Sequence, residues 1–479
     1  MKDINEVLIS TDTNEETVQL SKGRWWVLAT FSLFAFTQGM LWAIPGPISG
    51  AMTNLYGLDD TTIQLLINYG PIFYIPLSIP LAYWMDKPGG VRQATIWGIL
   101  TVALGQLCRN LAYDNSTLSI ALVHISYILN AIAGPVAMSA VGKISEDWFP
   151  VEFRSTSTAI MAEANLFGGA AAQLIGPQMV SDLSSMKEFL NFMYLCSAFM
   201  VLNVIMVLIY FPSHPPHPPS ISATTTKAAE QEMSMKSFGT ALKQLFINRS
   251  FIILICAYGL STGMYGSWAT VLSLNLNNCN AIYVGWLSFA STIAGNIGGL
   301  VLGRIADKFR NMKRLLVIFM ALSGISFVLF ALLASGIIKG QTICYEDGSA
   351  ALGLWILLVL GVLGGLFLNS TIPLYYELSL EVTYPIPEAT VCTMLTNMNN
   401  VGCLIFLGIP VTQYGSAWMN WLFSMTICVF TIGLIFLFDE RTLRYKVDTN
   451  QQDDDNNSAN NDNSINNENN DKEKLLLRS

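Results

Sequence analysis

The sequence predicts an all-α polytopic membrane protein in which twelve transmembrane helices form two halves of six. Hydrophobic residues make up 52% of the 479 residues and charged residues only 12%, with a mean hydropathy of +0.46. The apolar residues are gathered into twelve runs that polar segments separate. Soluble folds do not carry so many uninterrupted apolar runs of about 20 residues. A bilayer is therefore the expected solvent for most of the chain.

Each apolar run is long enough to cross a hydrocarbon core of about 30 Å as a helix. Backbone groups find no water inside a bilayer, so these runs are expected to be helical. They cover residues 25–48, 62–85, 94–113, 118–142, 156–180, 190–211, 250–274, 282–303, 314–336, 351–376, 389–413 and 415–438. A Pro-rich segment after the sixth run divides them into two sets of six.

The polar segments complete the predicted organisation. Residues 1–24 are expected to form a disordered tail, 25–211 the N-terminal half, 212–249 a central loop and 250–440 the C-terminal half. Residues 441–479 are rich in Asn and Asp and cannot bury a core, so they are expected to be a second disordered tail. The end of the central loop, around Phe238 to Asn248, is expected to form a short helix on the membrane face.

The distribution of positive charge predicts that both termini are cytosolic. With the N-terminus in the cytosol, 22 of the 25 Lys and Arg residues lie on that side, and the other three are Arg109, Lys187 and Lys339. The opposite, lumenal or external, face then carries the glycosylation sequon at Asn115. It also carries Cys279 and Cys344, which can form a disulfide in an oxidising space. Chance occurrence of the sequon and two free thiols are the alternatives.

Several functional classes find no support. The eight Cys include no CxxC pair, so no metal site or cofactor is predicted. The three His residues are scattered between one span and the central loop, which argues against an intramembrane enzyme. No basic surface for nucleic acid and no ATP-binding P-loop is present. A non-transporting receptor or scaffold remains an alternative.

A charged turn occurs at matching places in the two halves. The second-half copy, Gly303 to Arg314, reads GRIADKFRNMKR, and the first-half copy, Ala82 to Arg92, reads AYWMDKPGGVR. We expect these turns to clamp neighbouring helix ends in a way that breaks and reforms as the halves rock. A solvated loop that only fixes topology is the alternative. The residues assigned to this gating are Asp86, Arg92, Arg304, Asp307 and Lys308, with Glu377 and Glu381 at the exit of the tenth span as their acidic counterparts.

Polar residues in the middle of spans are the candidates for chemistry. A carboxylate in mid-span costs about 2.5–3.5 kcal/mol on insertion scales, so Glu163 is expected to face a cavity and carry a proton or pair with a cation. A protonated carboxyl held between helices is the alternative. The polar candidates for substrate binding are Asn68, Tyr69, Asn130, Asn165, Asn369 and Asn400. Helix packing through amide hydrogen bonds competes with binding at each Asn.

Longer stretches resemble a known family. The six-plus-six plan and the paired charged turns resemble the major facilitator superfamily and imply its fold. GRWWVLATFSLFAFTQGMLWAIPGPI (23–48), LNAIAGPVAM (129–138) and PLYYELSLEVTYPIPEAT (373–390) are similar to solute carrier family 49, which includes the feline leukaemia virus subgroup C receptor proteins. NYGPI and AGPVAM resemble in particular the lysosomal member called disrupted in renal carcinoma protein two. The similarity covers nearly all of residues 24 to 440.

This resemblance implies a secondary transporter that works as a monomer by alternating access. It implies a small organic substrate, with pyridoxine-like and choline-like molecules as the leading alternatives. In choline-transporting relatives, a Trp at the position of Trp42 belongs to an aromatic cage that binds the ammonium by cation–π attraction. The partner Tyr of that cage aligns with Gly266 here, which leaves Tyr265 and Trp268 as a possible aromatic wall for a planar ring. The relatives' Gln on the fifth helix aligns with Leu166, a second departure, whereas Asn400 falls where they have a binding Gln.

The C-terminal tail carries a sorting signal. Asp471, Leu475 and Leu476 fit the acidic dileucine pattern that clathrin adaptors read on cytosolic tails. The pattern predicts delivery to endolysosomes, and the plasma membrane is the alternative location.

Overall fold

The computed structural model describes residues 21–85, 87, 89–149, 151–216, 235–272, 276, 279–309, 312–337, 352–383, 386, 388–409 and 417–439. Several predicted residues lie outside this part of the chain, namely Asp86, Cys344, Asp471, Leu475 and Leu476. For Arg304, Asp307 and Lys308 only the backbone is described.

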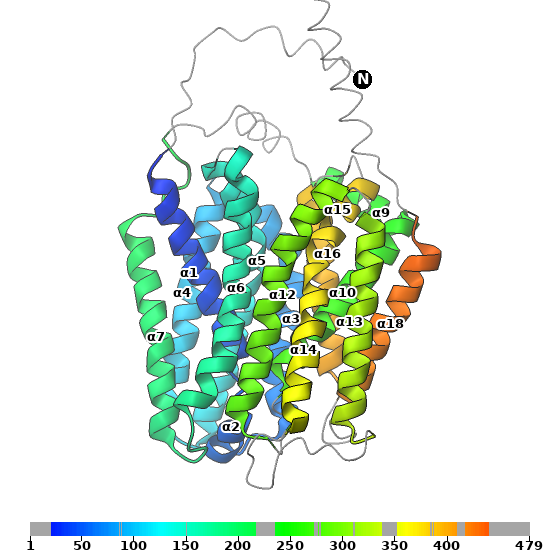
Figure 1. The fold of residues 1–479 in the computed structure, drawn as a ribbon. Coiled ribbons are helices and arrows are strands. Elements are labelled where there is room, and N and C mark those ends of the chain that lie inside the picture. The colour runs from blue at the N-terminus through cyan, green and yellow to red at the C-terminus, as the bar shows by residue number, and fades with distance from the viewer. Residues whose placement is uncertain are drawn as a thin grey trace, which may run out of the picture.

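The described chain is helical apart from its connections. The helices are α1 (Gly23–Ala43), α2 (Ser49–Tyr56), α3 (Asp60–Met85), α4 (Gly90–Leu111), α5 (Thr117–Trp148), α6 (Val151–Met179), α7 (Met186–Ile209), α9 (Met235–Ile247), α10 (Arg249–Thr270), α12 (Ala281–Phe309), α13 (Met312–Ala334), α14 (Leu352–Ser370), α15 (Ile372–Thr383), α16 (Glu388–Leu407) and α18 (Ala417–Leu437). Figure 1 shows the long helices side by side in one bundle, with α9 at one end and α2 at the other. We call these the α9 end and the α2 end.

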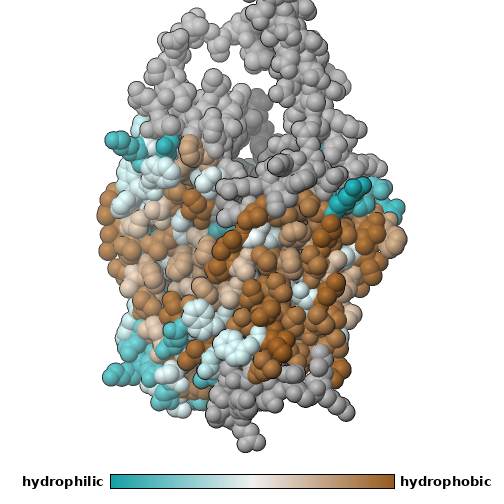
Figure 2. Space-filling view, viewed as in Figure 1, coloured by the Kyte–Doolittle hydropathy of each residue, from teal (hydrophilic) through white to brown (hydrophobic). Residues whose placement is uncertain are grey.

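The predicted polytopic helical fold is confirmed. Within the described residues, nine helical segments are long and apolar enough to cross a membrane. Three further helices, α4, α6 and α12, have 22, 29 and 29 residues and run through the same bundle. Figure 2 shows a hydrophobic band around the middle of the bundle, with hydrophilic residues towards both of its ends. This band is the surface that a bilayer would cover.

Several helices extend beyond the apolar runs that predict them. α5 continues to Trp148, α6 begins at Val151, and α12 continues through the charged stretch to Phe309. The second-half charged turn is therefore mostly helix, and the chain between α12 and α13 is shorter than predicted. Long charged side chains at a helix end can reach water, so a helix can continue beyond the last apolar residue of its span.

Proline interrupts two of the predicted spans. The first span divides into α1 and α2 around Pro45 and Pro47, as the sequence indicates. The tenth span divides into α14 and α15 at Thr371, two residues before Pro373. Proline removes a backbone donor and disfavours helical geometry in the residue before it, which accounts for both interruptions.

Each half has a buried core of its own. One cluster contains residues from Val27 to Phe211, and the other contains residues from Leu245 to Phe438. Ile67, on α3 of the first half, belongs to the second cluster. The side chain of Trp42 packs against both clusters. These two residues mark the junction between the halves.

Small residues let helices within each half approach to backbone contact. A Cβ added at Gly168 on α6 would lie 1.9 Å from the carbonyl oxygen of Phe36 on α1. In the second half, a Cβ at Gly263 on α10 would lie 2.1 Å from the carbonyl oxygen of Asn399 on α16. Such contacts replace the hydrophobic effect as the source of packing energy in lipid.

Two loops at the α2 end are held by acidic side chains. Asp59 accepts hydrogen bonds from the Thr62 hydroxyl and, at 3.1 Å, from the Thr62 amide, and these bonds lower the pKa of its carboxyl. Asp114 accepts from the Ser116 hydroxyl at 2.6 Å and from the Ser119 hydroxyl, which lowers the pKa of Asp114. Asn115 is exposed in this second loop, immediately before the first turn of α5.

The close approach at Gly168 gives a stability prediction. Gly168→Ala should force α1 and α6 apart and cost about 1–3 kcal/mol of stability, as overpacking does. The measurement is the midpoint of thermal unfolding in detergent. Gly433→Ala is the matched control, because no atom lies within 4 Å of a Cβ added there. Equal midpoints for the two variants would contradict the backbone contact.

Candidate functional site

Three tyrosine side chains from both halves gather near mid-span. The hydroxyls of Tyr258 on α10 and Tyr376 on α15 lie 3.5 Å apart. Tyr74 on α3 of the first half lies near both of them. Tyr74 and Tyr258 are close to the middle of their helices. The cluster therefore lies near the midplane, where transporters of two-half design hold their substrates.

Amide and hydroxyl groups extend this cluster across the junction. Ser78 on α3 donates to Asn397 Oδ1 on α16 at 3.0 Å, a hydrogen bond between the halves. The Tyr376 hydroxyl lies 3.3 Å from that of Thr396, and Asn400 donates to the Thr396 carbonyl at 2.9 Å. We call this set the junction cluster; its members are Tyr74, Ser78, Tyr258, Tyr376, Thr396, Asn397 and Asn400.

Asn400 of this cluster is among the substrate-binding residues predicted from the sequence. Tyrosine and serine inside an apolar span carry little hydropathy signal, so the hydroxyl groups were missed. Tyr74 and Ser78 are four residues apart and lie on one face of a helix. This four-residue spacing is the feature of the sequence that indicates a polar face on α3.

Trp42 lies at the junction on the α2 side of the cluster. Its indole Nε1 donates to the Ile67 carbonyl at 2.9 Å. A Cβ at Gly70 would lie 2.5 Å from that nitrogen, so the ring needs glycine there. The side chain is half-buried. Its neighbour on α3, Asn68, is buried and its Oδ1 has no hydrogen-bond partner.

Tyr265 and Trp268 lie in the packed core of the C-terminal half. Trp268 is 1% exposed, and its ring contacts those of Phe327, Phe330 and Phe423 at centroid distances of 5.2–5.5 Å. Its Nε1 donates to Asn420 Oδ1 at 2.8 Å. The Tyr265 hydroxyl lies 2.8 Å from that of Ser291. In this structure the two rings belong to the core and do not form a wall at the junction.

Asn369 lies between two helices of the same half. A Cβ added at Gly295 on α12 would lie 2.6 Å from the Asn369 amide nitrogen. Asn369 is buried on α14, and Tyr265 interacts with it by a side-chain hydrogen bond. This position matches the packing alternative for intramembrane amides.

Asn130 and Asn165 join a buried amide network in the N-terminal half. Asn165 Nδ2 donates to Gln38 Oε1 at 2.8 Å and to the Ala35 carbonyl at 2.9 Å. Asn130 and Gln38 exchange hydrogen bonds with each other's backbone at 3.3 and 3.4 Å. The network ties α1 to α5 and α6. Gln38 was missed in the sequence, although a Gln inside an apolar span is itself a signal.

Tyr69 pairs with a histidine away from the junction cluster. Its hydroxyl lies 3.1 Å from His124 Nδ1 on α5, and the two ring centroids are 5.9 Å apart. Tyr69 is nine residues before Ser78, which places it two and a half helical turns away on the opposite face of α3. The structure thus separates it from the residues that meet α16.

Glu163 is half-buried near the middle of α6. Its Oε2 atom is buried and has no hydrogen-bond partner. A buried carboxyl without a partner is costly when it is ionised and tolerable when it is protonated.

The two halves are in backbone contact at the α2 end. A Cβ at Gly46 would lie 1.7 Å from the Thr270 carbonyl oxygen, and one at Gly285 would lie 2.2 Å from that of Gln173. Gln173 Nε2 donates to the Thr270 carbonyl at 3.4 Å. In Figure 1, α6 and α12 run closer together at the α2 end than at the α9 end. Backbone contact thus closes the junction between the halves at the α2 end.

The predicted gating clamp stays a prediction. Arg92 Nε donates to the Phe211 carbonyl at 2.7 Å, which ties the start of α4 to the chain after α7. Glu377 is exposed and Glu381 is half-buried on α15. The other clamp side chains, including Asp307, lie outside the described part of the chain.

The structure describes one of the two cysteines of the predicted disulfide. Cys279 is disulfide-bonded. Its predicted partner, Cys344, lies outside the described residues, so the pairing itself stays a prediction. The described side chains contain no group of three or more His, Cys, Asp or Glu that could hold a metal ion.

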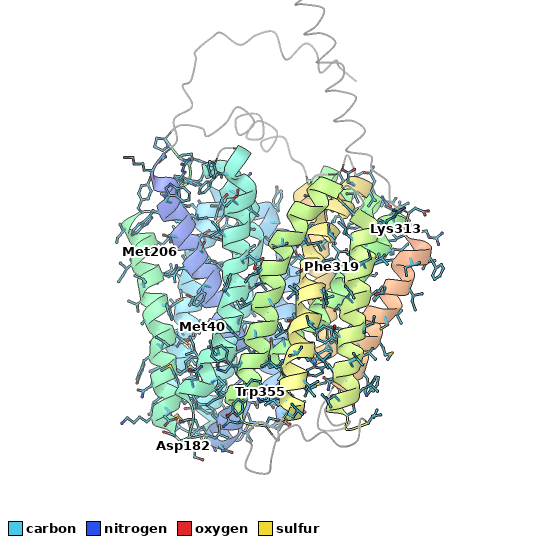
Figure 3. All side chains as sticks on the ribbon, in the orientation of Figure 1. Met40, Asp182, Met206, Lys313, Phe319 and Trp355 are labelled. Carbon is cyan, nitrogen blue, oxygen red and sulfur yellow. The ribbon has the colours of Figure 1, made fainter. Side chains whose placement is uncertain are left out.

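A cavity of about 430 Å³ lies on the outer surface of the bundle, between α12 and α14. It is lined by Tyr283, Trp286, Leu287, Ala290, Leu354, Trp355 and Leu358. Trp286 is 46% and Trp355 54% exposed, and Figure 3 shows Trp355 towards the α2 end. This lining is apolar and shares no residue with the junction cluster, so we do not assign the solute to it.

Residues 31–405 match the family model of the Major Facilitator Superfamily. The chain belongs to this superfamily. A solute carrier family 49 member 4 homolog of Xenopus tropicalis is 30% identical over 89% of this chain and 93% of its own length. The choline/ethanolamine transporter FLVCR2 of Rattus norvegicus is 25% identical over 87% of this chain and 74% of its own length. The resemblance to solute carrier family 49 is confirmed.

Solved transporter structures share the fold. A D-xylose–proton symporter aligns with a TM-score of 0.61 and 12% identity over 87% of this chain and 98% of its own. The xylose transporter XylE of E. coli, in a partially occluded inward-open conformation, aligns at 0.62 with 10% identity over 88% and 99%. At such identities the likeness concerns the fold alone.

Proposed function

We propose that the protein is a secondary transporter that binds a small organic solute at the junction cluster and moves it by alternating access. The observation that carries this proposal is the position of the cluster. Its hydroxyls and amides come from both halves near mid-span, and the halves are in backbone contact at the α2 end. A solute bound there would be exposed to opposite sides as the halves rock.

The chemistry of the cluster favours a ring solute that bears hydroxyl groups, such as a pyridoxine-like vitamin. Tyr258, Tyr376 and Asn400 offer hydrogen-bonding groups, and Trp42 offers an aromatic surface nearby. A quaternary ammonium makes no hydrogen bond and needs aromatic faces instead. A choline-like solute is the second candidate, because a relative is named a choline/ethanolamine transporter and Trp42 lies at the junction.

We further propose that transport is coupled to protons through Glu163 and that the α9 end is cytosolic. The orphan Oε2 of Glu163 supports a carboxyl that binds and releases a proton. The excess of Lys and Arg in the segments joined to the α9 end supports the orientation. The dileucine pattern supports endolysosomal delivery by clathrin adaptors, which makes the protein an exporter from that compartment.

Uptake at the cell surface tests the substrate and the coupling together. A variant with Leu475→Ala and Leu476→Ala should remain at the plasma membrane and take up labelled pyridoxine faster at acidic than at neutral external pH. Glu163→Gln should remove this pH dependence, because the amide cannot be ionised. Labelled choline is offered in parallel, and surface biotinylation checks the amount of protein.

Each alternative has its own outcome. Choline uptake that is indifferent to pH would favour the second candidate and make Glu163 a packing residue. Movement of neither solute, with the protein at the surface, would contradict both substrate assignments.

The tyrosine hydroxyls of the junction cluster can be tested one at a time. Tyr258→Phe should raise the KM for pyridoxine about three- to tenfold, the effect of losing one hydrogen bond. Tyr375→Phe is the matched control, because the Tyr375 hydroxyl is buried without a partner and its ring is adjacent to Tyr258. Equal KM values in the two variants would remove Tyr258 from the binding site.

Glycosylation of Asn115 tests the orientation. If the α2 end is lumenal, this exposed Asn should carry a glycan. Glycosidase treatment should then increase the mobility of the protein on a gel, and Asn115→Gln should abolish that shift. A glycan found instead on a site engineered into the central loop would reverse the orientation.

A further inference from the structure

We propose that Asn296 on α12 is the partner that Glu163 acquires when the two halves close at the α9 end. The pair would act as a proton-controlled latch between the halves. This inference rests on the proposed proton-coupled transport and adds the residue through which the protonation state of Glu163 reaches the conformation.

Both side chains have a buried polar atom without a partner. Glu163 Oε2 accepts no hydrogen bond, and Asn296 Nδ2 donates none. Asn296 is only 7% exposed. An ionised carboxylate can only accept and an amide nitrogen can only donate, so the two orphan atoms are complementary. Burying either one alone costs about 1–3 kcal/mol, so a conformation that pairs the two atoms is stabilised relative to one that does not.

The two residues lie at the same depth on antiparallel helices. Gln173 of α6 meets Gly285 of α12 at the α2 end, where a Cβ on the glycine would lie 2.2 Å from the glutamine carbonyl. Glu163 is ten residues from Gln173 and Asn296 is eleven from Gly285, both towards the α9 end. At a rise of 1.5 Å per residue, these separations are about 15 and 16.5 Å.

They also lie on the faces that the two helices turn towards each other. Pro177 of α6 contacts the same glycine, with its Cγ 3.6 Å from the added Cβ. Glu163 is 14 residues before Pro177, close to four full turns, and Asn296 is 11 residues after Gly285, close to three. At about 100° per residue, Glu163 is turned about 40° from Pro177 and Asn296 about 20° from Gly285, so each lies on the side of its helix that faces the other helix.

No other charged group competes for Glu163 among the described side chains. Burial is the one influence on the ionisation of the Glu163 carboxyl, and no charged neighbour contributes. The helices packed on α6 carry their described titratable groups elsewhere. On α1 and α12 these are Arg24 and Tyr283, each in the first turn. On α5 they are His124 against Tyr69, Tyr127 under the Arg109 guanidinium, and Lys143 and Asp147 near the helix end. On α7 they are Lys187 and Glu188 in the first turn, the exposed Tyr194 and the buried Cys196.

The protonation state then selects the conformation. In this structure, where α6 and α12 diverge towards the α9 end, Glu163 Oε2 has no donor. When α6 and α12 close, Asn296 Nδ2 can donate to the carboxylate in a charge-assisted bond. Loss of the proton therefore favours closure, and proton binding allows opening, since a group shifts a two-state equilibrium by its differential free energy in the two states. A proton released at the open α9 end would close that end and reset the transporter.

Distance measurements between spin labels test the latch directly. Labels at Thr156→Cys on α6 and Val301→Cys on α12 occupy exposed sites near the α9 end, in a background without other reactive cysteines. Raising the pH from 5 to 8 should increase the short-distance population. Asn296→Ala should lower the closed-to-open ratio about tenfold at pH 8, the effect of losing a hydrogen bond to a charged group, and leave pH 5 unchanged.

Two further variants keep the test decisive. Thr292→Ala is the control, because it lies one turn away on α12 and its hydroxyl bonds the Ser288 carbonyl within the helix. It should behave as the unmodified chain. Asn296→Asp places a second acid opposite Glu163 and should hold the α9 end open at pH 8.

The outcomes separate the latch from the proposed coupling. If Glu163→Gln abolishes the pH dependence of uptake but Asn296→Ala leaves the distance shift intact, the coupling stands and the latch is wrong. If Glu163→Gln leaves uptake dependent on pH, the proposed coupling fails and the latch fails with it.

Discussion

The absence of water inside a bilayer is the constraint on which this structure depends. Every backbone group in a span must bond within its helix, so the chain crosses as helices. The same constraint makes polar side chains within the spans seek hydrogen-bond partners in the protein. Gln38, Asn130 and Asn165 form hydrogen bonds in one network and bind helices together. Glu163 and Asn296 leave polar atoms unpaired on helices that belong to different halves, so another arrangement of the halves can pair them.

Packing within the halves differs from packing between them. Inside each half, glycines bring helix backbones into direct contact, as at Gly168 and Gly263. Between the halves, similar contact occurs at the α2 end, at Gly46 and Gly285, whereas one side-chain hydrogen bond joins Ser78 to Asn397 at mid-span. Rocking requires two rigid halves that are joined less tightly to each other than their own helices are. Packed interiors move as units and do not deform continuously.

Hydropathy and charge were sufficient to predict the fold, because a run of about 20 apolar residues can form few structures other than a membrane helix. The site was harder to predict. Trp42 lies at the junction, but Tyr265 and Trp268 pack into a core, since one residue along a helix turns a side chain by about 100°. Tyr74, Tyr258 and Tyr376 were missed because a hydroxyl on a large ring hardly changes the hydropathy of a span. Which face of each helix meets the other half is a property of tertiary packing, and one sequence does not reveal it.

The acidic loop residues at the α2 end have a consequence for the compartment in which we place the protein. A carboxyl whose pKa is lowered in the folded state contributes stability above its unfolded pKa and loses it only as the pH falls through the folded value. Asp59 and Asp114 are both held in this way by neighbouring hydroxyls. Mild acidification therefore leaves their hydrogen bonds intact. The loops at the α2 end can thus keep their shape in an acidic medium, as the lumenal side of the compartment that we propose would require.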